Sequence, residues 1–255
     1  MKISKRIISL LMAALLVFGL PLSAFASDGG EIRIATAEDW KSFVKNCKLD
    51  TWSVGKTVVL DTDLDLGGNF TPVPVFSGTF DGNGHSIHMG SYTSAASDTG
   101  VFRYVSEGAV VKNLTVTGTW EPSGGKSAIG GIVGHNNGTI ENCMFNGVVD
   151  GKNNIGGIAG INENTGVITG CTVRGEIRGE HYTGGVAGQN LGSIIRCTNE
   201  SSVNTDGAEI APTLDDIDVS HINNTENLSA YTDTGGITGF SSGLLQGCQN
   251  TGEIG

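Results

Sequence analysis

Three aspartates close together in the sequence are the first candidates for chemistry. Asp215, Asp216 and Asp218 lie in an acidic stretch, residues 205–228, that also contains His221. Clustered carboxylate oxygens are the ligands that Ca²⁺ prefers, so these aspartates could form a weak calcium site. Adjacent aspartates are also common in ordinary solvated loops, and the sequence leaves both interpretations open. Apart from weakly bound Ca²⁺, we expect no cofactor.

A second acidic motif occurs earlier, where Asp61, Asp63 and Asp65 alternate with other residues. On one β-strand this spacing places three carboxylates on the same face. The motif differs from an EF-hand loop because its sixth position is not glycine and its twelfth is not glutamate. We expect a solvated strand face, and a weak calcium site shared with Asp81 is the alternative.

The cysteines could form disulfides, a metal site or a row of thiols. Cys143, Cys171, Cys197 and Cys248 follow four glycine-rich blocks at nearly the same offset. Side chains at equivalent positions of stacked strands point in parallel, whereas a disulfide needs converging Cβ atoms. No two cysteines have the short spacing of a zinc knuckle. We therefore predict a row of small buried thiols, with Cys47 unpaired in an N-terminal helix.

Catalytic signatures are mostly missing. The His-Glu-x-x-His pattern of zinc peptidases does not occur. A polysaccharide lyase or glycoside hydrolase needs paired carboxylates about 5–10 Å apart in a groove, and a chain rich in Asp and Glu could supply them. Such an enzyme is the alternative to a non-catalytic protein.

A glycine-rich repeat organises the second half of the chain. Blocks with the pattern Gly-Gly-Ile/Val-x-Gly begin at residues 130, 156, 184 and 235, and a cysteine follows each block after 13 to 15 residues. Each unit contains three short segments that are rich in β-branched residues and separated by Gly and Asn turns. One unit has no second layer to cover its apolar face, so successive units must stack.

Stacking of these units predicts an all-β parallel β-helix with continuous internal rows, in which equivalent residues lie about 4.8 Å apart. The apolar row consists of Ile132, Ile158, Val186 and Ile237. A second row consists of Asn136, Asn162 and Asn190, with Ser241 in the fourth unit. Asparagine tolerates turn conformations and its amide can bond the next coil, so we expect a structural role rather than ligand contact.

The glycine blocks resemble the GLUG repeat of secreted and cell-surface bacterial proteins. The segments 58–66 and 76–85 are similar to the usual lead-in to such repeats, and the resemblance covers roughly residues 31–255. It implies a right-handed β-helix of pectin-lyase-like architecture and a surface or adhesin-like role. Some relatives with such repeats are metallopeptidases that cleave immunoglobulin A, but their peptidase motif is absent here.

The N-terminal residues predict export. Basic residues, an apolar run and the small-x-small motif Ala24-Phe25-Ala26 make residues 1–26 a secretory signal peptide. Residues 27–56 are predicted to cap the β-helix. Thr36, followed by Glu38 and Asp39, favours a helix start, and a helix over 37–46 would place its apolar residues on one face.

The remaining residues divide into two regions. We assign residues 57–126 to the first coils and residues 127–255 to GLUG-type repeats. The acidic insertion at about 205–228 has nearly the length of one coil, so it is either a degenerate coil or a protruding loop. The last residues begin a strand and stop, which predicts C-terminal truncation and further domains in a longer polypeptide.

Charge and predicted export limit the partners. The net charge is −11, and removal of three basic residues with the signal peptide makes it −14. We exclude nucleic acid, which needs a basic surface, and membrane insertion after signal cleavage. The predicted function is a non-catalytic scaffold or adhesin-like module, secreted or displayed at the cell surface, with an unidentified host or cell-surface glycan or protein as its partner.

Overall fold

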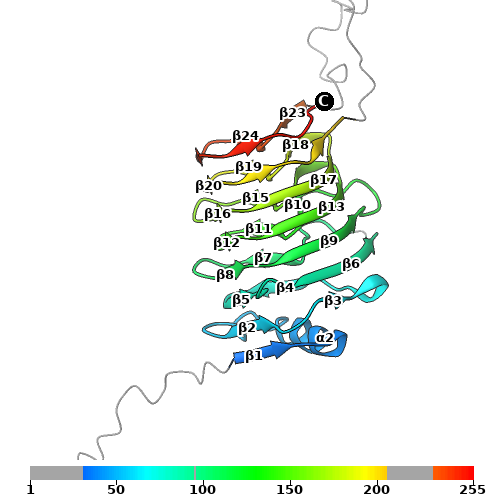
Figure 1. Cartoon of the computed structure of the whole chain (residues 1–255), viewed down its shortest axis with the longest axis vertical. Coiled ribbons are helices and arrows are strands. Elements are labelled where there is room, and N and C mark those ends of the chain that lie inside the picture. The colour runs from blue at the N-terminus through cyan, green and yellow to red at the C-terminus, as the bar shows by residue number, and fades with distance from the viewer. Residues whose placement is uncertain (1–30, 95, 206–231) are drawn as a thin grey trace, which may run out of the picture. The chain divides into compact units, whose positions relative to one another are not determined.

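The protein is a parallel β-solenoid of about six turns (Figure 1). The computed structural model describes residues 31–94, 96–205 and 232–255, and within these ranges it contains one α-helix. The predicted all-β parallel β-helix is confirmed. Neighbouring strands are parallel throughout the described sheets, with a register that joins equivalent residues of successive coils.

Four parallel sheets form the walls of the solenoid. Sheet A contains β1 (Glu31–Ile34), β2 (Thr57–Leu60), β5 (Thr79–Asp81), β8 (Val110–Lys112), β12 (Thr139–Glu141), β16 (Val167–Thr169), β20 (Ser193–Ile195) and β25 (Leu244–Gln246). Sheet B contains β3 (Leu64–Asp65), β6 (Ser86–Tyr92), β9 (Thr115–Trp120), β13 (Met144–Asp150), β17 (Thr172–Arg178), β21 (Thr198–Asn199), β22 (Ser202–Val203) and β26 (Gln249–Asn250). Sheet C contains β4 (Val73–Phe76), β7 (Phe102–Val105), β11 (Val133–Asn136), β15 (Ala159–Asn162), β19 (Ala187–Asn190) and β24 (Thr238–Ser241). Sheet D contains β10 (Ile129–Gly130), β14 (Asn153–Gly156), β18 (His181–Gly184) and β23 (Thr232–Gly235).

Each complete coil has four strands, so the prediction of three strands per unit was wrong. The chain passes through sheets A, B, D and C in that order, for example through β12, β13, β14 and β15. The additional strand belongs to sheet D and has two to four residues. All four strands of sheet D end in glycine, which is depleted in strands, so pairing with the neighbouring coils stabilises them rather than local propensity.

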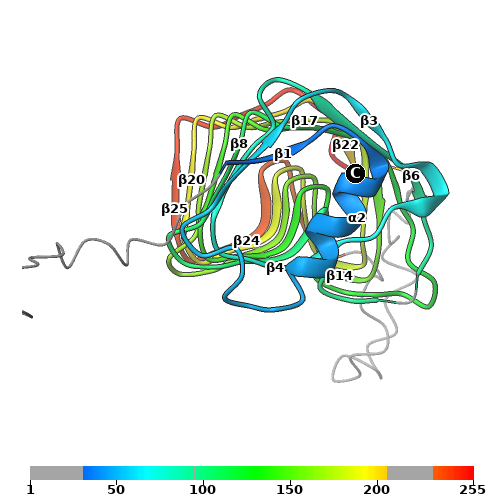
Figure 2. The ribbon, with the colours of Figure 1, turned by 90° about the horizontal axis from the view of Figure 1, so that it is seen from below.

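The helix α2 (Ala37–Asn46) closes the N-terminal opening of the solenoid (Figure 2). Thr36 is its N-cap and forms a capping box with Asp39, as the sequence motif predicts. Trp40, Phe43 and Val44 are buried against the first coils, and the Trp40 indole N–H donates to the Thr71 carbonyl at 3.2 Å. The helix therefore covers an apolar end that would otherwise contact water.

The internal apolar row follows the glycine blocks. Ile132, Ile158 and Val186 are fully buried, and Ile237 in the last coil is half-buried. Their backbones join coil to coil, because Ile132 N–H donates to the Ile158 carbonyl at 3.1 Å and Ile158 N–H donates to that of Val186 at 2.9 Å. The row lies where the chain bends from sheet D into sheet C.

The glycines of each block allow sheets D and C to approach closely. A Cβ on Gly156, in sheet D, would meet the Ala159 carbonyl oxygen and would lie 2.6 Å from the Ala187 Cα. A Cβ on Gly160, in sheet C, would lie 2.6 Å from the Ile129 nitrogen. These neighbours are backbone atoms that no change of rotamer can move. The pattern of the block is therefore a packing requirement.

The coils on either side of the acidic insertion pair directly with each other. β18 pairs with β23, in register from His181 opposite Thr232 to Gly184 opposite Gly235. No coil therefore separates these two strands, and the insertion itself lies outside the described residues. In the preceding coil, only residues 179 and 180 lie between β17 and β18, whereas residues 204–231 lie between β22 and β23 in the sequence.

Asn204 holds the two ends of this connection together. Its amide nitrogen donates to the Gly179 carbonyl and to the Thr234 hydroxyl, each at 2.9 Å, and its amide oxygen accepts from Gly179 N–H at 2.8 Å. Asn204 is buried and has a φ of 53°, a conformation that asparagine tolerates. The solenoid thus keeps its register across the insertion.

Substituting the first glycine of a block tests the packing requirement. We expect Gly156→Ala to lower the free energy of unfolding by about 1–3 kcal/mol or more, because the methyl group overlaps backbone atoms. The control is Gly68→Ala, where a Cβ would have no neighbour within 4 Å, and we expect a change within about 0.5 kcal/mol. Urea unfolding followed by circular dichroism measures both, and equal losses would contradict the argument.

Candidate functional site

A ladder of asparagine amides runs along the junction of sheets C and A. Asn136 Nδ2 donates to Asn162 Oδ1, and Asn162 Nδ2 donates to Asn190 Oδ1, each at 2.8 Å. Asn190 Nδ2 donates to the Ser241 hydroxyl at 3.0 Å. The three asparagines are fully buried, and each amide also donates to a nearby backbone carbonyl. The amides therefore join successive coils and are not available to a ligand.

Sequence reasoning missed a second amide ladder. Asn199, fully buried in sheet B, donates from Nδ2 to Asn250 Oδ1 at 2.8 Å. It continues a register that holds Phe145 and Val173 in the preceding coils. The pattern Cys-x-Asn, present at Cys197 and again at Cys248, could have revealed it. The core thus changes from apolar to amide side chains in the last coils.

The four repeat cysteines lie in one row where sheet A turns into sheet B. Each sulfur lies near a carbonyl two residues earlier and a carbonyl of the preceding coil; for Cys171 these are Thr169 at 3.4 Å and Ile140 at 3.7 Å. Cys143, Cys171 and Cys197 are buried and Cys248 is half-buried. Cys47 is the C-cap of α2 and is buried. All five are free thiols.

Burial suppresses the reactivity of these thiols. It raises the pKa of Cys47 to about 12 and holds the pKa of Cys171 well above its ordinary range. Hydrogen bonding to Cys171 and burial raise the pKa of Cys197, and burial also raises that of Cys248. Because the thiolate is the nucleophile and the metal ligand, the row packs as small apolar groups.

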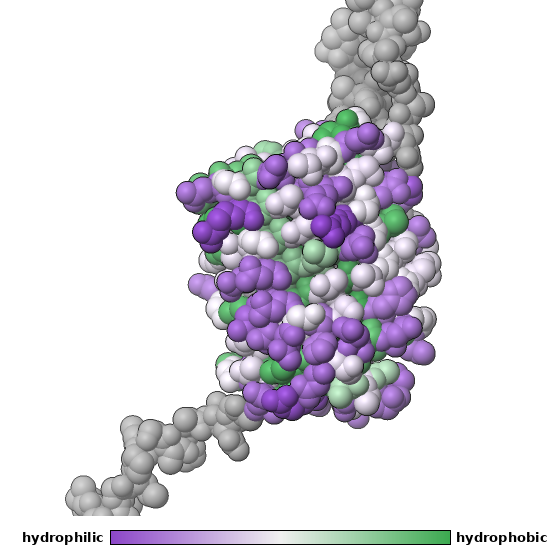
Figure 3. All heavy atoms as spheres, viewed as in Figure 1, coloured by the Kyte–Doolittle hydropathy of each residue, from purple (hydrophilic) through white to green (hydrophobic). Residues whose placement is uncertain are grey.

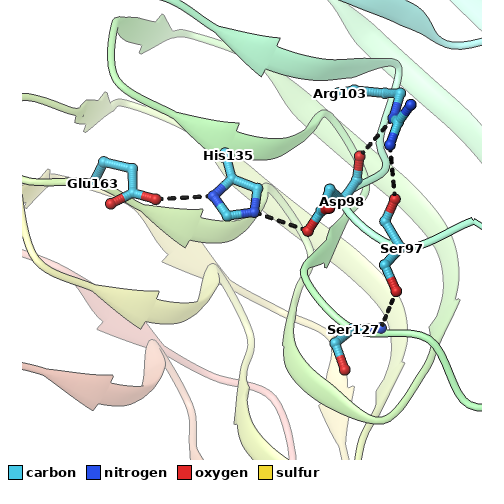
Figure 4. A network of polar contacts seen from close by, with 6 residues as sticks. All are labelled: Ser97, Asp98, Arg103, Ser127, His135 and Glu163. Atoms are coloured by element: carbon cyan, nitrogen blue, oxygen red, sulfur yellow. Dashed lines mark hydrogen bonds and ion pairs between the residues drawn. The ribbon is translucent and has the colours of Figure 1, made fainter.

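A cluster of polar contacts surrounds His135 (Figure 4). His135 Nδ1 lies 2.8 Å from Glu163 Oε1, and its Nε2 lies 3.0 Å from Asp98 Oδ1. The Tyr104 ring stacks on the imidazole with centroids 5.3 Å apart, and Arg103 Nε donates to the Asp98 carbonyl at 3.1 Å. Burial and then the negative charge of Asp98 raise the pKa of Tyr104.

This geometry fits a structural clamp and does not fit catalysis or metal binding. Both ring nitrogens of His135 already contact carboxylates, so neither is available as a general base. Asp98 and Glu163 lie on opposite sides of the ring and cannot converge on one ion (Figure 4). The three residues come from three successive coils, so the cluster ties those coils together.

The earlier acidic motif does not form one strand face, so that interpretation was wrong. β2 ends at Leu60 and β3 begins at Leu64, and the chain turns a corner between sheets A and B. Asp61 accepts from Arg33 at 2.6 Å, whereas Asp63 accepts from Ser86 N–H at 2.7 Å. The alternation spans two sheets, and the carboxylates face different partners.

Asp81 has partners of its own. Lys112 Nζ lies 3.3 Å from it, and the Asn113 amide donates to it at 3.0 Å. Burial raises the pKa of Asp81, but hydrogen bonds from Asn113 and Asn83, together with Lys112, outweigh burial and lower it. In the described part of the chain, no three His, Cys, Asp or Glu side chains form a metal-binding group. Asp215, Asp216, Asp218 and His221 lie outside the described residues.

Most outer carboxylates of sheet B are paired with basic side chains. Arg174 Nε donates to Glu200 at 2.8 Å, and Arg178 Nη2 lies 2.6 Å from Glu176 and its Nη1 3.8 Å from Asp150. Burial raises the pKa of Asp150, and Arg178 opposes that shift. The face visible in Figure 3 is mainly hydrophilic, with small separate apolar patches. Within the described ranges, no helix has the length and apolar character to cross a bilayer.

Four parallel sheets, glycine contacts and repeated ladders define a parallel β-helix. The family model described as the GLUG motif matches residues 125–150 and 151–178, which are two successive repeats. The chain is also 29% identical over 121 residues to halomucin from Haloquadratum walsbyi. That match covers 44% of this chain and 1% of halomucin, so the chain corresponds to a very small part of that relative.

A solved structure has a similar fold. It is a Bacteroides ovatus protein whose assignment as an immunoglobulin A1 protease is itself a proposal, and it superposes with a TM-score of 0.61 at 18% identity. The similarity covers 89% of this chain and 68% of that one. At this level of identity the likeness establishes the β-helix and leaves activity undetermined.

Removing one amide from the ladder tests its contribution to stability. We expect Asn162→Ala to lower the free energy of unfolding by about 1–3 kcal/mol, because it leaves the buried Asn136 amide without its partner. The control is Asn146→Ala on the exposed face of β13, with an expected change within about 0.5 kcal/mol. Similar values for the two variants in urea unfolding would show that the ladder does not stabilise the fold.

Thiol labelling tests the cysteine row. In the native protein we expect Cys248 to react first with a thiol reagent and the four buried cysteines to react slowly. At a pKa of about 12 against an ordinary 9.0, the Cys47 thiolate population falls by about a thousandfold. In urea without reductant all five should react. Detection of a Cys143–Cys171 disulfide by peptide mass spectrometry would contradict the assigned geometry.

Proposed function

We propose that this protein is a non-catalytic β-helix that is secreted or displayed at the cell surface, where it acts as a scaffold and an adhesin-like binding module. The internal positions of its repeats form the apolar, amide and thiol rows that join the coils. The outer positions vary from coil to coil and are free to contact a partner. This division between a constant interior and a variable exterior suits a binding surface on a rigid support.

The observation that carries the proposal is that the outer acidic and basic side chains pair with one another. His135 has both nitrogens in contact with carboxylates, and most carboxylates on or beside sheet B lie 2.6–3.8 Å from arginine or lysine. A glycosidase or lyase requires two acidic groups, or an acid and a base, converging on a bound sugar with unoccupied lone pairs. Asp98, Glu163 and most carboxylates on or beside sheet B instead pair with His135, arginine or lysine.

The comparisons support the proposal at a coarser level. Halomucin and the GLUG motif both favour a surface-type β-helix, and the predicted signal peptide over residues 1–26 supports export. The Bacteroides ovatus neighbour shares only the fold, and the same fold can serve unrelated functions. Its proposed protease activity is therefore a second function to be tested directly.

Two measurements test the proposal. The first is protease treatment of intact cells that express the full chain: surface display predicts digestion of the protein without lysis, whereas protection until lysis would contradict it. The second is incubation of purified residues 27–255 with polygalacturonate, neutral polysaccharides and immunoglobulin A1. We expect no unsaturated uronate, no new reducing ends and no cleavage, and turnover of any of these substrates would refute the non-catalytic assignment.

A further inference from the structure

An exposed aromatic pair lies where sheets D and C meet in the last coils. Tyr182 in β18 and Phe240 in β24 are 38% and 41% exposed. Their rings contact each other with centroids 5.9 Å apart and planes at 74°. The contact crosses from one sheet to the other, so the two rings form one surface rather than two isolated side chains.

Two side-chain amides lie one coil earlier, next to these rings. Gln189 is directly opposite Phe240 in the register of sheet C, and Asn154 is opposite Tyr182 in sheet D. Among the described residues, neither amide has a hydrogen-bond partner for its side chain. Asn154 Oδ1 is itself buried from solvent, so Gln189 and the Asn154 Nδ2 group are the amide groups that a ligand could reach. Tyr182, Phe240, Asn154 and Gln189 form what we call the aromatic–amide patch.

The backbone at Tyr182 is a third observation that favours a function here. Its φ is 52°, in the left-handed region. The equivalent residues of the other coils also have positive φ and are Asp98, Ala128, Asn154 and Asp233. Aspartate and asparagine tolerate this conformation, whereas a bulky ring is disfavoured. A tyrosine at a site where smaller residues fit better indicates that its ring has a role outside the fold.

We propose that the aromatic–amide patch binds a neutral carbohydrate. A pyranose has an apolar C–H face, which packs against an aromatic ring, and a rim of hydroxyl groups, which both donate to and accept from amides. The patch offers both surfaces within neighbouring coils, about 4.8 Å apart. This inference rests on the proposed function as a binding module and names the class of its ligand.

Charge favours a neutral ligand over an acidic one. The patch contains no charged side chain, and the chain without residues 1–26 carries a net charge of −14. An acidic polysaccharide would meet long-range repulsion with no basic residue in the patch to offset it. A neutral glycan carries no charge and would avoid this repulsion. An aliphatic peptide would leave the amides unpaired, which costs free energy on binding.

The variants that test the patch replace each ring with the residue found at the equivalent position of the preceding coil. Tyr182→Asn and Phe240→Gln place the residues of the preceding coil, Asn154 and Gln189, one coil further on. Both remove a ring, and asparagine suits the positive φ at position 182, so the double variant should fold and melt at the same temperature or higher. The matched control is Leu49→Ala in the N-terminal cap, where the side chain is 64% exposed.

The measurement is affinity electrophoresis of residues 27–255 through native gels that contain mannan, dextran, soluble starch or polygalacturonate. We expect retardation by at least one neutral polysaccharide and none by polygalacturonate. The double variant should bind at least about tenfold more weakly, and Leu49→Ala should bind as the unsubstituted protein does. Unchanged retardation of the folded double variant, binding of polygalacturonate alone, or no retardation by any gel would overturn the inference.

The two proposals can fail separately in these experiments. Degradation of a polysaccharide in the gel would refute the non-catalytic assignment and leave the aromatic–amide patch to be judged by the variants. Retardation that does not depend on the two rings would refute the patch and leave the binding module intact.

Discussion

The close approach of sheets D and C is the constraint on which the rest of the structure depends. A side chain as small as a methyl group at the block glycines would overlap backbone atoms of the neighbouring strand. With glycine there, the chain bends sharply and directs Ile132, Ile158 and Val186 into the core. The amide and thiol rows then follow each glycine block at nearly the same offset. Regular glycines thus determine the register of every other row.

The repeating part of the fold could be predicted from the sequence because several internal positions are occupied by similar residues in successive coils. Ile132, Asn136 and Cys143 each begin such a series, and the spacing alone indicates stacking. The short strands of sheet D could not be predicted, because pairing between coils stabilises them. The corner between Asp61 and Asp65 was missed because alternation along a sequence does not reveal a change of sheet.

The polar contacts of the outer face were beyond sequence reasoning for a related reason. Asp98, His135 and Glu163 are far apart in the chain, and each belongs to a different coil. They do not form a series of one residue type at equivalent positions, so no repeated pattern connects them. Their contact depends on which residue of one coil faces which residue of the next. Function in such a protein therefore depends on the differences between repeats, whereas the similarities between repeats account for folding.

The direct pairing of β18 with β23 also has a mechanical consequence. When force is applied along the axis of the solenoid, it passes from coil to coil through the hydrogen bonds between these strands. Asn204 adds a side-chain contact between the same two coils, because its amide donates to the Thr234 hydroxyl. Tension on the β-helix would therefore be carried by the paired strands themselves, and the two coils would separate only when these hydrogen bonds break.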